Sequence, residues 1–246
     1  MATFYLAPEL RPEDCLSGSV VSVTGSEARH AVTVSRIRSG ERLLIGNGAG
    51  LMLAGTVVTA DPAEFTLRVD VATETPPSTP RIRLVQALAK GDRDEMAIQA
   101  ATELGIDGVI PWAAARSVSR WEGPKVAKGQ ERWSSIVREA SKQSIRPWLP
   151  TIGALASTKQ LAVLATTTRM LLLEPTASVR LTDVPAPNDD RDIVLVVGPE
   201  GGISPGELSL LEQAGATQVR LGDTVLRTST AGPAALAILN ATLGRW

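Results

Sequence analysis

The sequence has very few residues that bind metal ions or form cross-links. Its 246 residues include one cysteine, Cys15, and one histidine, His30. A lone cysteine excludes an intrachain disulfide and a metal site built from several thiolates, and a lone histidine excludes a histidine-rich metal centre. We therefore expect chemistry that needs no metal ion.

Long apolar runs are also missing. No stretch approaches the ~18 consecutive apolar residues of a membrane helix. The first residues, MATFYLAPEL, lack the basic segment and apolar run of a secretory signal. The default expectation is a soluble cytoplasmic protein. With 43% hydrophobic residues, the chain can bury a substantial core.

The formal net charge is −1, which gives no global electrostatic reason to expect nucleic-acid binding. The local distribution is uneven, because the segment 116–146 holds eight basic residues against three acidic ones. Trp121, Trp133 and Trp148 lie among these charges, where aromatic rings can stack on bases. Trp133 falls on an apolar helical stripe, so we expect it in the core.

A change of pattern near residue 73 indicates two domains. The segment 73–80, TETPPSTP, has three prolines and no large apolar residue, which is typical of an exposed linker. We expect a small β-domain over 1–73, a linker over 74–80 and a second domain over 81–246. In the first domain, Asn47 and Gly48 stand between two apolar runs and predict a hairpin turn.

The second domain alternates strand-like and helical segments, which predicts an α/β fold with a mostly parallel sheet. Asp92 and Glu95 resemble a capping box that opens a helix ending at Leu104, and a long amphipathic helix is expected over 129–144. The expected strands cover 81–88, 109–112, 170–173, 193–197 and 218–221.

A glycine-rich loop follows the most apolar of these strands. The strand 193–197 leads directly into the loop 198–202, GPEGG, and the segment 204–207, SPGE, then predicts a helix with a capped start. Loops beyond the carboxyl ends of parallel strands are where α/β sheets bind ligands, and glycine lets a ligand approach the backbone closely. An ordinary strand-to-helix turn is the alternative interpretation.

A second loop, 222–230, has the same setting, between the strand 218–221 and a helix expected over 231–243. Arg227 and the hydroxyls of Thr228, Ser229 and Thr230 come just before that helix, a position suited to an anionic or carboxylate group. Structural capping is the alternative for one or two of the hydroxyls.

Glu174 and Pro175 follow the strand 170–173 in the same way. The glycine patterns of dinucleotide-binding and P-loop proteins, the serine elbow of hydrolases and the histidine pair of zinc proteases are all missing. These four classes therefore lose their main support.

Taken in order, GPEGG at 198–202, LG at 221–222 and LRTSTA at 226–231 resemble the SPOUT superfamily of methyltransferases. Within it, the chain is similar to the RsmE family, the 16S ribosomal RNA uridine-N3 methyltransferases. Further matching segments run through the chain: FYL at 4–6, His30 with VSR at 34–36, KGDRDE at 90–95, ELG at 103–105, ARSV at 115–118, REASKQSIRPWLP at 138–150 and LEP at 173–175.

This resemblance implies a PUA-like β-barrel followed by a SPOUT α/β domain with a trefoil knot, in a homodimer whose cofactor sites lie near the partner subunit. It implies S-adenosylmethionine as the methyl donor, bound by the loops of the knot. The cofactor residues expected on this basis are Leu173, Glu174, Gly198, Pro199, Glu200, Gly201, Gly202, Leu221, Gly222, Leu226, Arg227, Thr228, Ser229, Thr230 and Ala231.

The substrate that the resemblance implies is 16S ribosomal RNA within the small ribosomal subunit. Arg227 is the expected catalytic residue, because a guanidinium can stabilise the negative charge that develops on the uracil carbonyls as the N3 proton leaves. Ser229 is a second catalytic candidate. His30 is expected to be structural or RNA-facing. The residues expected to contact RNA phosphates are Arg36, Arg38, Arg116, Arg132, Arg138, Lys142 and Arg146.

The chain departs from the family at two places. The family usually reads LR-x-E-T-A, and Ser229 stands where the glutamate would be; it often reads E-Q where this chain has Lys142 and Gln143. We therefore assign no general base. One alternative is a SPOUT ribose 2′-O-methyltransferase, although the N-x-G-x-x-x-R and S-L-N-V motifs of that class are missing. Another is a non-catalytic RNA-binding or ribosome-assembly protein with the same fold.

Overall fold

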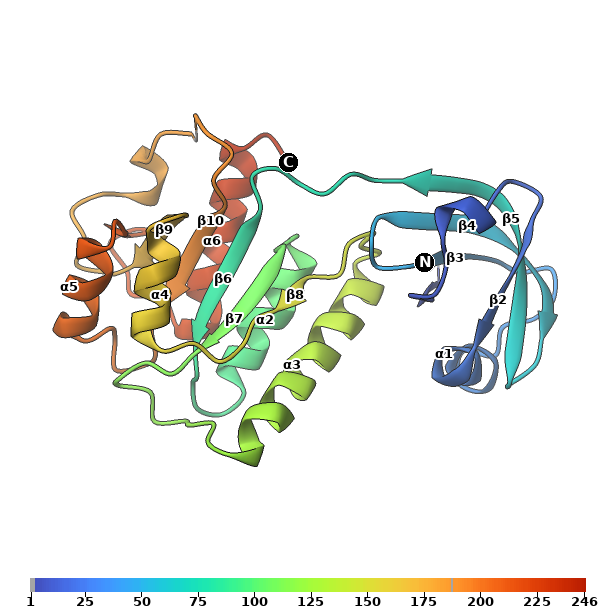
Figure 1. The fold of residues 1–246 in the computed structure, drawn as a ribbon, viewed down its shortest axis with the longest axis horizontal. Helices are drawn as coiled ribbons and strands as arrows, with labels where there is room; N and C mark the ends of the chain where they lie inside the picture. The colour runs from blue at the N-terminus through green and yellow to red at the C-terminus, as the bar shows by residue number, and fades with distance from the viewer. Residues whose placement is uncertain (1–2, 187) are drawn as a thin grey trace. The chain divides into compact units, whose positions relative to one another are not determined.

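The computed structural model describes residues 3–186 and 188–246, and these form two compact units. The first unit extends to Pro77 and also includes Ser141–Leu149, whereas the second comprises Ser78–Ala140 and Pro150–Trp246. The sequence analysis placed 141–149 inside the second domain, but the structure groups this segment with the first unit. Figure 1 shows the order of the elements along the chain.

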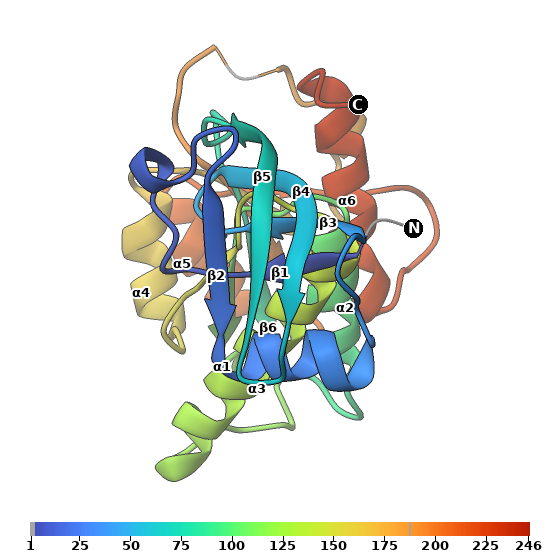
Figure 2. The same ribbon diagram turned by 90° about the vertical axis from the view of Figure 1, so that its right-hand side faces the viewer.

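The first unit contains a five-stranded sheet with the order β1-β3-β4-β5-β2. Its strands are β1 (Phe4–Leu6), β2 (Val20–Thr24), β3 (Arg42–Gly46), β4 (Leu51–Ala60) and β5 (Glu64–Glu74). Only β1 and β3 pair in parallel; β2, β5 and β4 lie side by side as antiparallel neighbours (Figure 2). Alternate side chains enter one core, in which Tyr5 packs edge-on against Phe65. The short elements are α1 (Gly25–Arg29), a π-helical turn (His30–Val34) and a 3-10 turn (Pro12–Asp14).

The hairpin predicted at Asn47 is confirmed, because β3 and β4 pair in antiparallel fashion across the loop 47–50. The Asn47 carboxamide oxygen accepts hydrogen bonds from the backbone N–H groups of Ala49 (2.8 Å) and Leu51 (3.1 Å). An asparagine that bonds to the backbone two residues further on stabilises a tight turn locally.

The segment Ser141–Leu149 is bonded to the rest of the first unit. The backbone N–H of Gly50 donates to the carbonyl of Pro147 (2.9 Å), and the indole N–H of Trp148 donates to the carbonyl of Thr75 (2.8 Å). Both bonds join residues far apart in sequence, so no local pattern could have assigned this segment to the first unit.

The second unit contains a six-stranded sheet with the order β11-β9-β10-β6-β7-β8. Every neighbouring pair in it is parallel, which confirms the predicted mostly parallel sheet. The strands are β6 (Ile82–Ala87), β7 (Gly108–Trp112), β8 (Thr151–Ile152), β9 (Arg169–Leu173), β10 (Ile193–Val197) and β11 (Thr217–Val219).

Helices cover both faces of this sheet. They are α2 (Arg93–Glu103), α3 (Pro124–Gln143), α4 (Thr158–Ala165), α5 (Pro205–Gln213) and α6 (Thr228–Thr242), with a 3-10 turn at Leu181–Asp183. Side chains of a strand alternate between its two faces. In β10, Ile193 and Leu195 pack in the core shared with α2, α3 and α6, whereas Val194 and Val196 pack in the core shared with α4 and α5.

Three boundaries in the second unit differ from those predicted by two residues or more. Strand β11 ends at Val219, two residues before the predicted end. Helix α3 begins at Pro124 and not at residue 129, and α6 begins at Thr228 and not at residue 231. Proline and threonine are weak helix formers, so the hydrophobic pattern placed both helix starts too late.

The capping box predicted at Asp92 is wrong, although α2 does begin there. Asp92 adopts a left-handed conformation (φ 59°) and its side chain caps nothing. The buried Asp94 carboxylate instead accepts hydrogen bonds from the backbone N–H groups of Ala89 (3.2 Å) and Glu95 (2.9 Å). The carboxylate therefore anchors the loop that precedes α2.

The capped start predicted for α5 is confirmed. The Ser204 hydroxyl accepts the N–H of Glu207, and the Glu207 carboxylate accepts the N–H of Ser204 (3.1 Å). The other carboxylate oxygen accepts bonds from the backbone N–H of Ala115 (2.8 Å) and the hydroxyl of Thr158 (2.9 Å). Burial raises the pKa of Glu207, but these hydrogen bonds outweigh burial and hold the pKa below its ordinary value.

We expect Glu207→Gln to lower the free energy of unfolding at neutral pH by about 1–3 kcal/mol, because it removes a buried charged acceptor. A lowered folded-state pKa contributes stability above the unfolded pKa of ~4.3, and that contribution is lost as the pH falls through the folded value. The difference between wild type and variant should therefore shrink in acid. Chemical denaturation at neutral pH and near pH 3 measures it.

Glu212→Gln is the matched control, because Glu212 is exposed near the end of the same helix. This control should leave the free energy of unfolding nearly unchanged at both pH values. A loss as large as that of Glu207→Gln would show that the buried hydrogen bonds are not responsible.

Candidate functional site

A cavity of about 330 Å³ lies at the carboxyl ends of three parallel strands. Leu173, Val197 and Val219, the last residues of β9, β10 and β11, line it, together with the loop after β10 and the start of α6. Its size is within the ~300–1,000 Å³ that is usual for small-ligand sites. The cavity is therefore at the edge of the sheet where α/β proteins bind ligands.

The structure brings most of the expected cofactor residues to this cavity. Those that line it are Leu173, Glu174, Gly198, Pro199, Glu200, Gly202, Leu221, Gly222, Leu226, Arg227, Thr228 and Ala231. Gly201, Ser229 and Thr230 are not among the lining residues. Ser229 and Thr230 lie in the first turn of α6.

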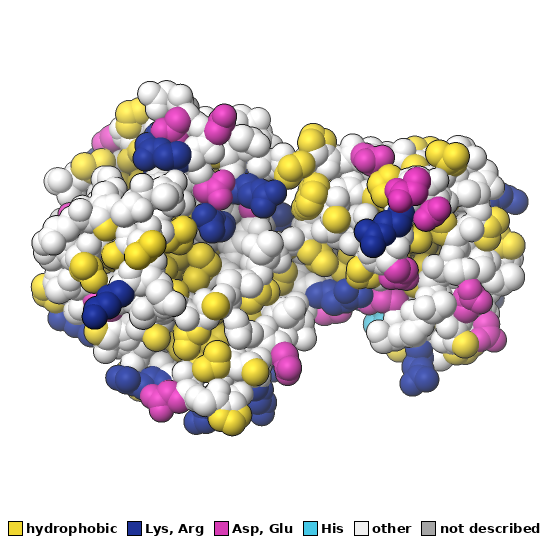
Figure 3. Space-filling model, in the orientation of Figure 1, with side chains coloured by type: hydrophobic (Ala, Val, Ile, Leu, Met, Phe, Trp, Pro, Cys, Tyr) yellow, Lys and Arg dark blue, Asp and Glu magenta, His cyan; other side chains and the backbone are white. Residues whose placement is uncertain are grey.

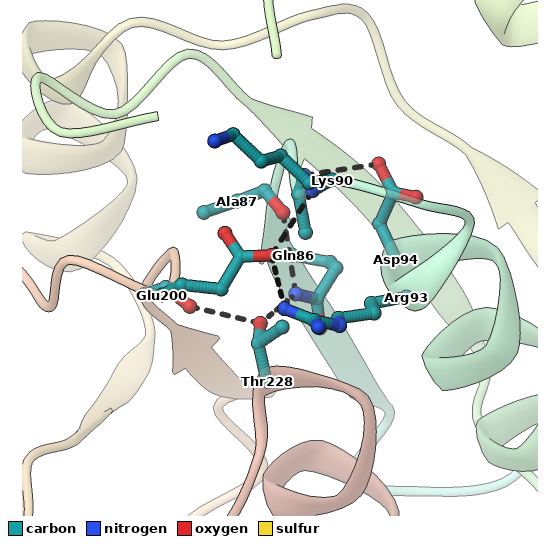
Figure 4. Close-up of polar contacts among 9 residues, drawn as sticks. Gln86, Ala87, Lys90, Arg93, Asp94, Glu200 and Thr228 are labelled. Atoms are coloured by element: carbon teal, nitrogen blue, oxygen red, sulfur yellow. Dashed lines mark hydrogen bonds and ion pairs between the residues drawn. The ribbon is translucent and has the colours of Figure 1, made fainter. Parts of the chain in front are cut away.

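The Thr228 hydroxyl is at the centre of a buried polar network (Figure 4). It donates to the carbonyl of Gly198 (2.9 Å) and accepts a hydrogen bond from the side-chain amide of Gln86 (2.9 Å). Gln86 is fully buried in β6 and also donates to the carbonyl of Ala87 (3.2 Å). A single hydroxyl therefore joins β6, the loop after β10 and the start of α6.

The Glu200 carboxylate is bonded to the loop before α2 (Figure 4). One carboxylate oxygen accepts the backbone N–H of Lys90 (3.0 Å) and the guanidinium of Arg93 (3.1 Å). Burial raises the pKa of Glu200, but the hydrogen bonds and the Arg93 charge outweigh it and lower the pKa below its ordinary value. Glu200 is therefore ionised at neutral pH, in a cavity wall that it shares with Arg93.

The loop 198–202 is held in shape by its own backbone and by one arginine. The N–H of Gly202 donates to the carbonyl of Pro199 (2.8 Å), and Gly202 has a φ of 71°, which favours glycine. The guanidinium of Arg116 donates to the carbonyl of Gly201 (3.0 Å). Arg116 was expected to contact RNA; in the structure it supports this loop.

Two further arginines line the cavity. Arg220 donates to the carbonyls of Ala177 and Ser178 (both 2.9 Å), and so joins the end of β11 to the segment after β9. Arg227 is exposed at the N-cap position of α6. Within the part of the chain that the structure describes, no side chain pairs with its guanidinium, which leaves it available to a ligand.

The other residues expected to contact RNA are divided between the two units. Arg36 and Arg38 are exposed in the first unit, and Lys142 and Arg146 belong to that unit as well. The side chain of Lys142 is only 9% exposed and pairs with Glu27 (3.4 Å). Lys142 therefore has little surface with which to meet a phosphate.

Arg132 and Arg138 lie on α3 in the second unit. Arg132 forms a two-pronged ion pair with Glu95 of α2, and Arg138 is half-buried. On the face drawn in Figure 3, basic side chains lie among acidic ones and form no continuous basic field. The basic segment 116–146 thus does not form a single surface within one unit.

Three residues of the site were not predicted from the sequence: Gln86, Arg93 and Arg220. Gln86 had a usable signal, because it is the one polar residue in the apolar run 84–89. Arg93 lay within a segment quoted for the family resemblance, but no role followed from its position alone. Arg220 had no signal, because its partners are backbone carbonyls some forty residues away along the chain.

Two absences hold for residues 3–186 and 188–246. No helix there combines the length and the apolar character needed to span a membrane. No cluster of three or more His, Cys, Asp or Glu side chains there has the arrangement of a metal site.

The parallel sheet and the cavity at its strand ends are those of an α/β protein with a candidate small-ligand site at the edge of its sheet. Residues 76–240 match the family model of the RNA methyltransferase domain, and the chain belongs to this family. The family predicted from the sequence is confirmed.

Relatives of known name agree with this family. The chain is 43% identical over 235 residues to the ribosomal RNA small subunit methyltransferase E of Mycobacterium bovis, covering 94% of this chain and 89% of the relative. A ribosomal RNA small subunit methyltransferase E from Neisseria gonorrhoeae, solved with S-adenosylmethionine bound, has a TM-score of 0.85 at 26% identity over 98% of both chains. A Legionella pneumophila methyltransferase, solved with the same cofactor, has a TM-score of 0.84 at 29% identity, again over 98% of both chains.

We expect Thr228→Val to lower the free energy of unfolding by about 1–3 kcal/mol, because Gly198 and Gln86 each lose a buried hydrogen-bond partner. Valine keeps the shape of threonine, so packing changes little. Thermal and chemical denaturation measure the loss. Thr228→Ser keeps the hydroxyl and should lose clearly less; an equal loss in both variants would show that the hydroxyl bonds contribute no more than the packing of the methyl group.

Proposed function

We propose that this protein transfers a methyl group from S-adenosylmethionine to N3 of a specific uridine in 16S ribosomal RNA, within the small ribosomal subunit. One observation carries the proposal: a chain of the RNA methyltransferase family has its ligand cavity at the ends of β9, β10 and β11. The 43% identity to a ribosomal RNA small subunit methyltransferase E supports the choice of substrate.

The residues of the cavity fit the cofactor. Leu173, Val197 and Leu226 offer apolar surface for the adenine ring, and the backbone of the loop 198–202 offers polar groups. The ionised Glu200 suits the ammonium of the methionine part. When bound, the cofactor supplies an electrophilic methyl group. Two solved relatives that hold S-adenosylmethionine support this assignment.

Arg227 is the residue to which we assign a catalytic role. Uracil N3 carries an imide proton, and the flanking carbonyl oxygens gain negative charge as that proton leaves. A cationic donor already in position stabilises such charge without reorganisation. Among the described lining residues, Arg227 has a guanidinium that no side chain pairs, whereas Arg93 is paired with Glu200.

Ser229 takes no proton in this proposal. It stands where the family usually has a glutamate, but a neutral serine is a poor base and its side chain does not line the cavity. The ribose 2′-O-methyltransferase and the non-catalytic RNA-binding protein are the alternatives, and the tests below distinguish them from N3 methylation.

We further infer the fold details and partners that the family implies. The second unit, Ser78–Ala140 and Pro150–Trp246, is the SPOUT domain with a trefoil knot, and the first unit is a PUA-like barrel that binds RNA. Thr228 bonds both to Gln86 of β6 and to Gly198 after β10, which supports a knot in which the C-terminal segment passes between earlier segments of the chain. A cytoplasmic homodimer completes the proposal.

Deleting the gene should abolish 3-methyluridine in small-subunit ribosomal RNA, and restoring the gene should recover it. Nucleoside mass spectrometry of purified 16S RNA measures this. Unchanged 3-methyluridine excludes the assignment, and loss of a ribose-methylated nucleoside in its place identifies the first alternative. Wild-type complementation is the control for effects of the deletion on neighbouring genes.

Arg227→Ala should lower single-turnover methyl transfer by roughly 10²-fold or more, because it removes the donor aimed at developing charge. Ser229→Ala should cost at most one hydrogen bond, about 0.5–1.5 kcal/mol. Kinetics at saturating cofactor and RNA separate these effects from binding. A larger loss in Ser229→Ala would place the hydroxyl in proton transfer and contradict the electrostatic role of Arg227.

A further inference from the structure

A second cavity, of about 610 Å³, is lined by residues that flank Arg93 of the cofactor cavity in sequence. The loop before α2 separates the two: Arg93 lines the first cavity, whereas Lys90 and Asp92 line the second. The same loop holds Glu200 through the N–H of Lys90. A ligand in the second cavity would therefore lie next to the loop that shapes the cofactor site.

Trp121 precedes α3 in sequence, packs against that helix and lines this second cavity. Its ring packs edge-on against the buried Trp133, with centroids 5.2 Å apart and an interplanar angle of 75°. Gly129, inside α3, lies against the indole so closely that any β-carbon there would overlap it. Glycine destabilises a helix interior relative to alanine, so its presence at this position is explained by the indole that it admits.

Four basic and three acidic side chains line this cavity, and they differ in how they are paired. Lys90, Lys125 and Lys128 line the cavity and are exposed, and within the described residues nothing pairs with their ammonium groups. The acidic Glu95 is neutralised by Arg132.

Of the remaining acidic groups, Asp94 is buried and accepts two backbone N–H groups. Asp92 is the one acidic side chain of the cavity that is both exposed and without a bonded partner among the described residues. The cavity thus presents an aromatic ring beside a surplus of unpaired cations.

We propose that this second cavity binds a nucleotide of single-stranded RNA next to the target uridine, with its base against Trp121 and its phosphate at Lys125 and Lys128. The inference rests on the proposed function. Aromatic stacking together with lysine contacts to the backbone is how proteins hold unpaired nucleotides, and RNA is read mainly where bases are unstacked. An acidic peptide would satisfy the lysines but would leave the indole without a planar partner.

Trp121→Ala should weaken binding of a fluorescent single-stranded uridine-rich RNA by about 5- to 50-fold, whereas Trp121→Phe should keep most of the affinity. Fluorescence anisotropy with the full-length protein measures this. Calorimetric affinity for S-adenosylmethionine should not change, which shows that the fold and first cavity are intact. Wild-type RNA affinity in folded Trp121→Ala would overturn the proposal.

The double substitution Lys125→Ala and Lys128→Ala tests the cavity without touching its packed ring. It should weaken RNA binding and lower the slope of log affinity against log salt by roughly 0.7 per lost phosphate contact on a single strand. Lys159→Ala, on the exposed face of α4, is the matched control and should change neither quantity. If Lys159→Ala weakened RNA binding as much as the double substitution, the lysines would act only through general charge attraction, and the proposal would be overturned.

Two further experiments test whether the ligand is RNA or a free nucleotide, and whether the proposed function itself holds. Uridine monophosphate at the same concentration as the RNA should not displace it; displacement would assign the cavity to a free nucleotide and overturn the RNA assignment. Methylation of small subunits from a deletion strain tests the proposed function itself. If wild-type protein methylates these subunits and Trp121→Ala leaves the KM for subunits unchanged, only the proposal for the second cavity is rejected. If wild-type protein methylates nothing, the proposed function itself is rejected.

Discussion

The cofactor cavity depends on the hydroxyl of Thr228. A threonine hydroxyl can donate one hydrogen bond while accepting others, and here it donates to Gly198 and accepts from Gln86. Gln86 lies in β6, 142 residues earlier in the chain, and Gly198 lies in the loop after β10, 30 residues earlier. The two hydrogen bonds therefore fix the start of α6 against both segments. The N-cap position of Arg227 follows directly, since Arg227 is the residue before Thr228.

Charge pairing decides which groups of the cavity remain free. Arg93 is committed to Glu200, and Arg220 is committed to backbone carbonyls, so Arg227 is left without a side-chain partner among the described residues. Arg227 is exposed, so water screens part of its charge, but its guanidinium can still form charge-assisted hydrogen bonds to an anionic group. The same pairing keeps Glu200 ionised. Among the described lining residues, the cavity therefore presents Arg227 as an unpaired positive group and Glu200 in its ion pair with Arg93.

The basic segment illustrates how a count of charges differs from a binding surface. Arg116 supports the glycine-rich loop, Arg132 joins α3 to Glu95, and Lys142 is paired and mostly buried. Charges used in this way stabilise the fold and are less available to phosphates. The lysines at 125 and 128 differ, because they are exposed beside Trp121 and lack partners within the described chain. The balanced total charge of the protein conceals this local arrangement.

The sequence by itself determined the β character of the first unit, five of the six strands of the parallel sheet, the capped start of α5 and the loops that follow β9, β10 and β11, because hydrophobic period and turn residues act locally. It also carried the family, through motifs kept in order. Only the tertiary structure decided that Gln86, Arg93 and Arg220 belong to the site, that 141–149 returns to the first unit, and that Thr228 opens α6. The physical reason is the same in each case. These outcomes rest on hydrogen bonds between residues tens to more than a hundred positions apart, and a pattern read along the chain contains no information about which distant partner closes such a bond.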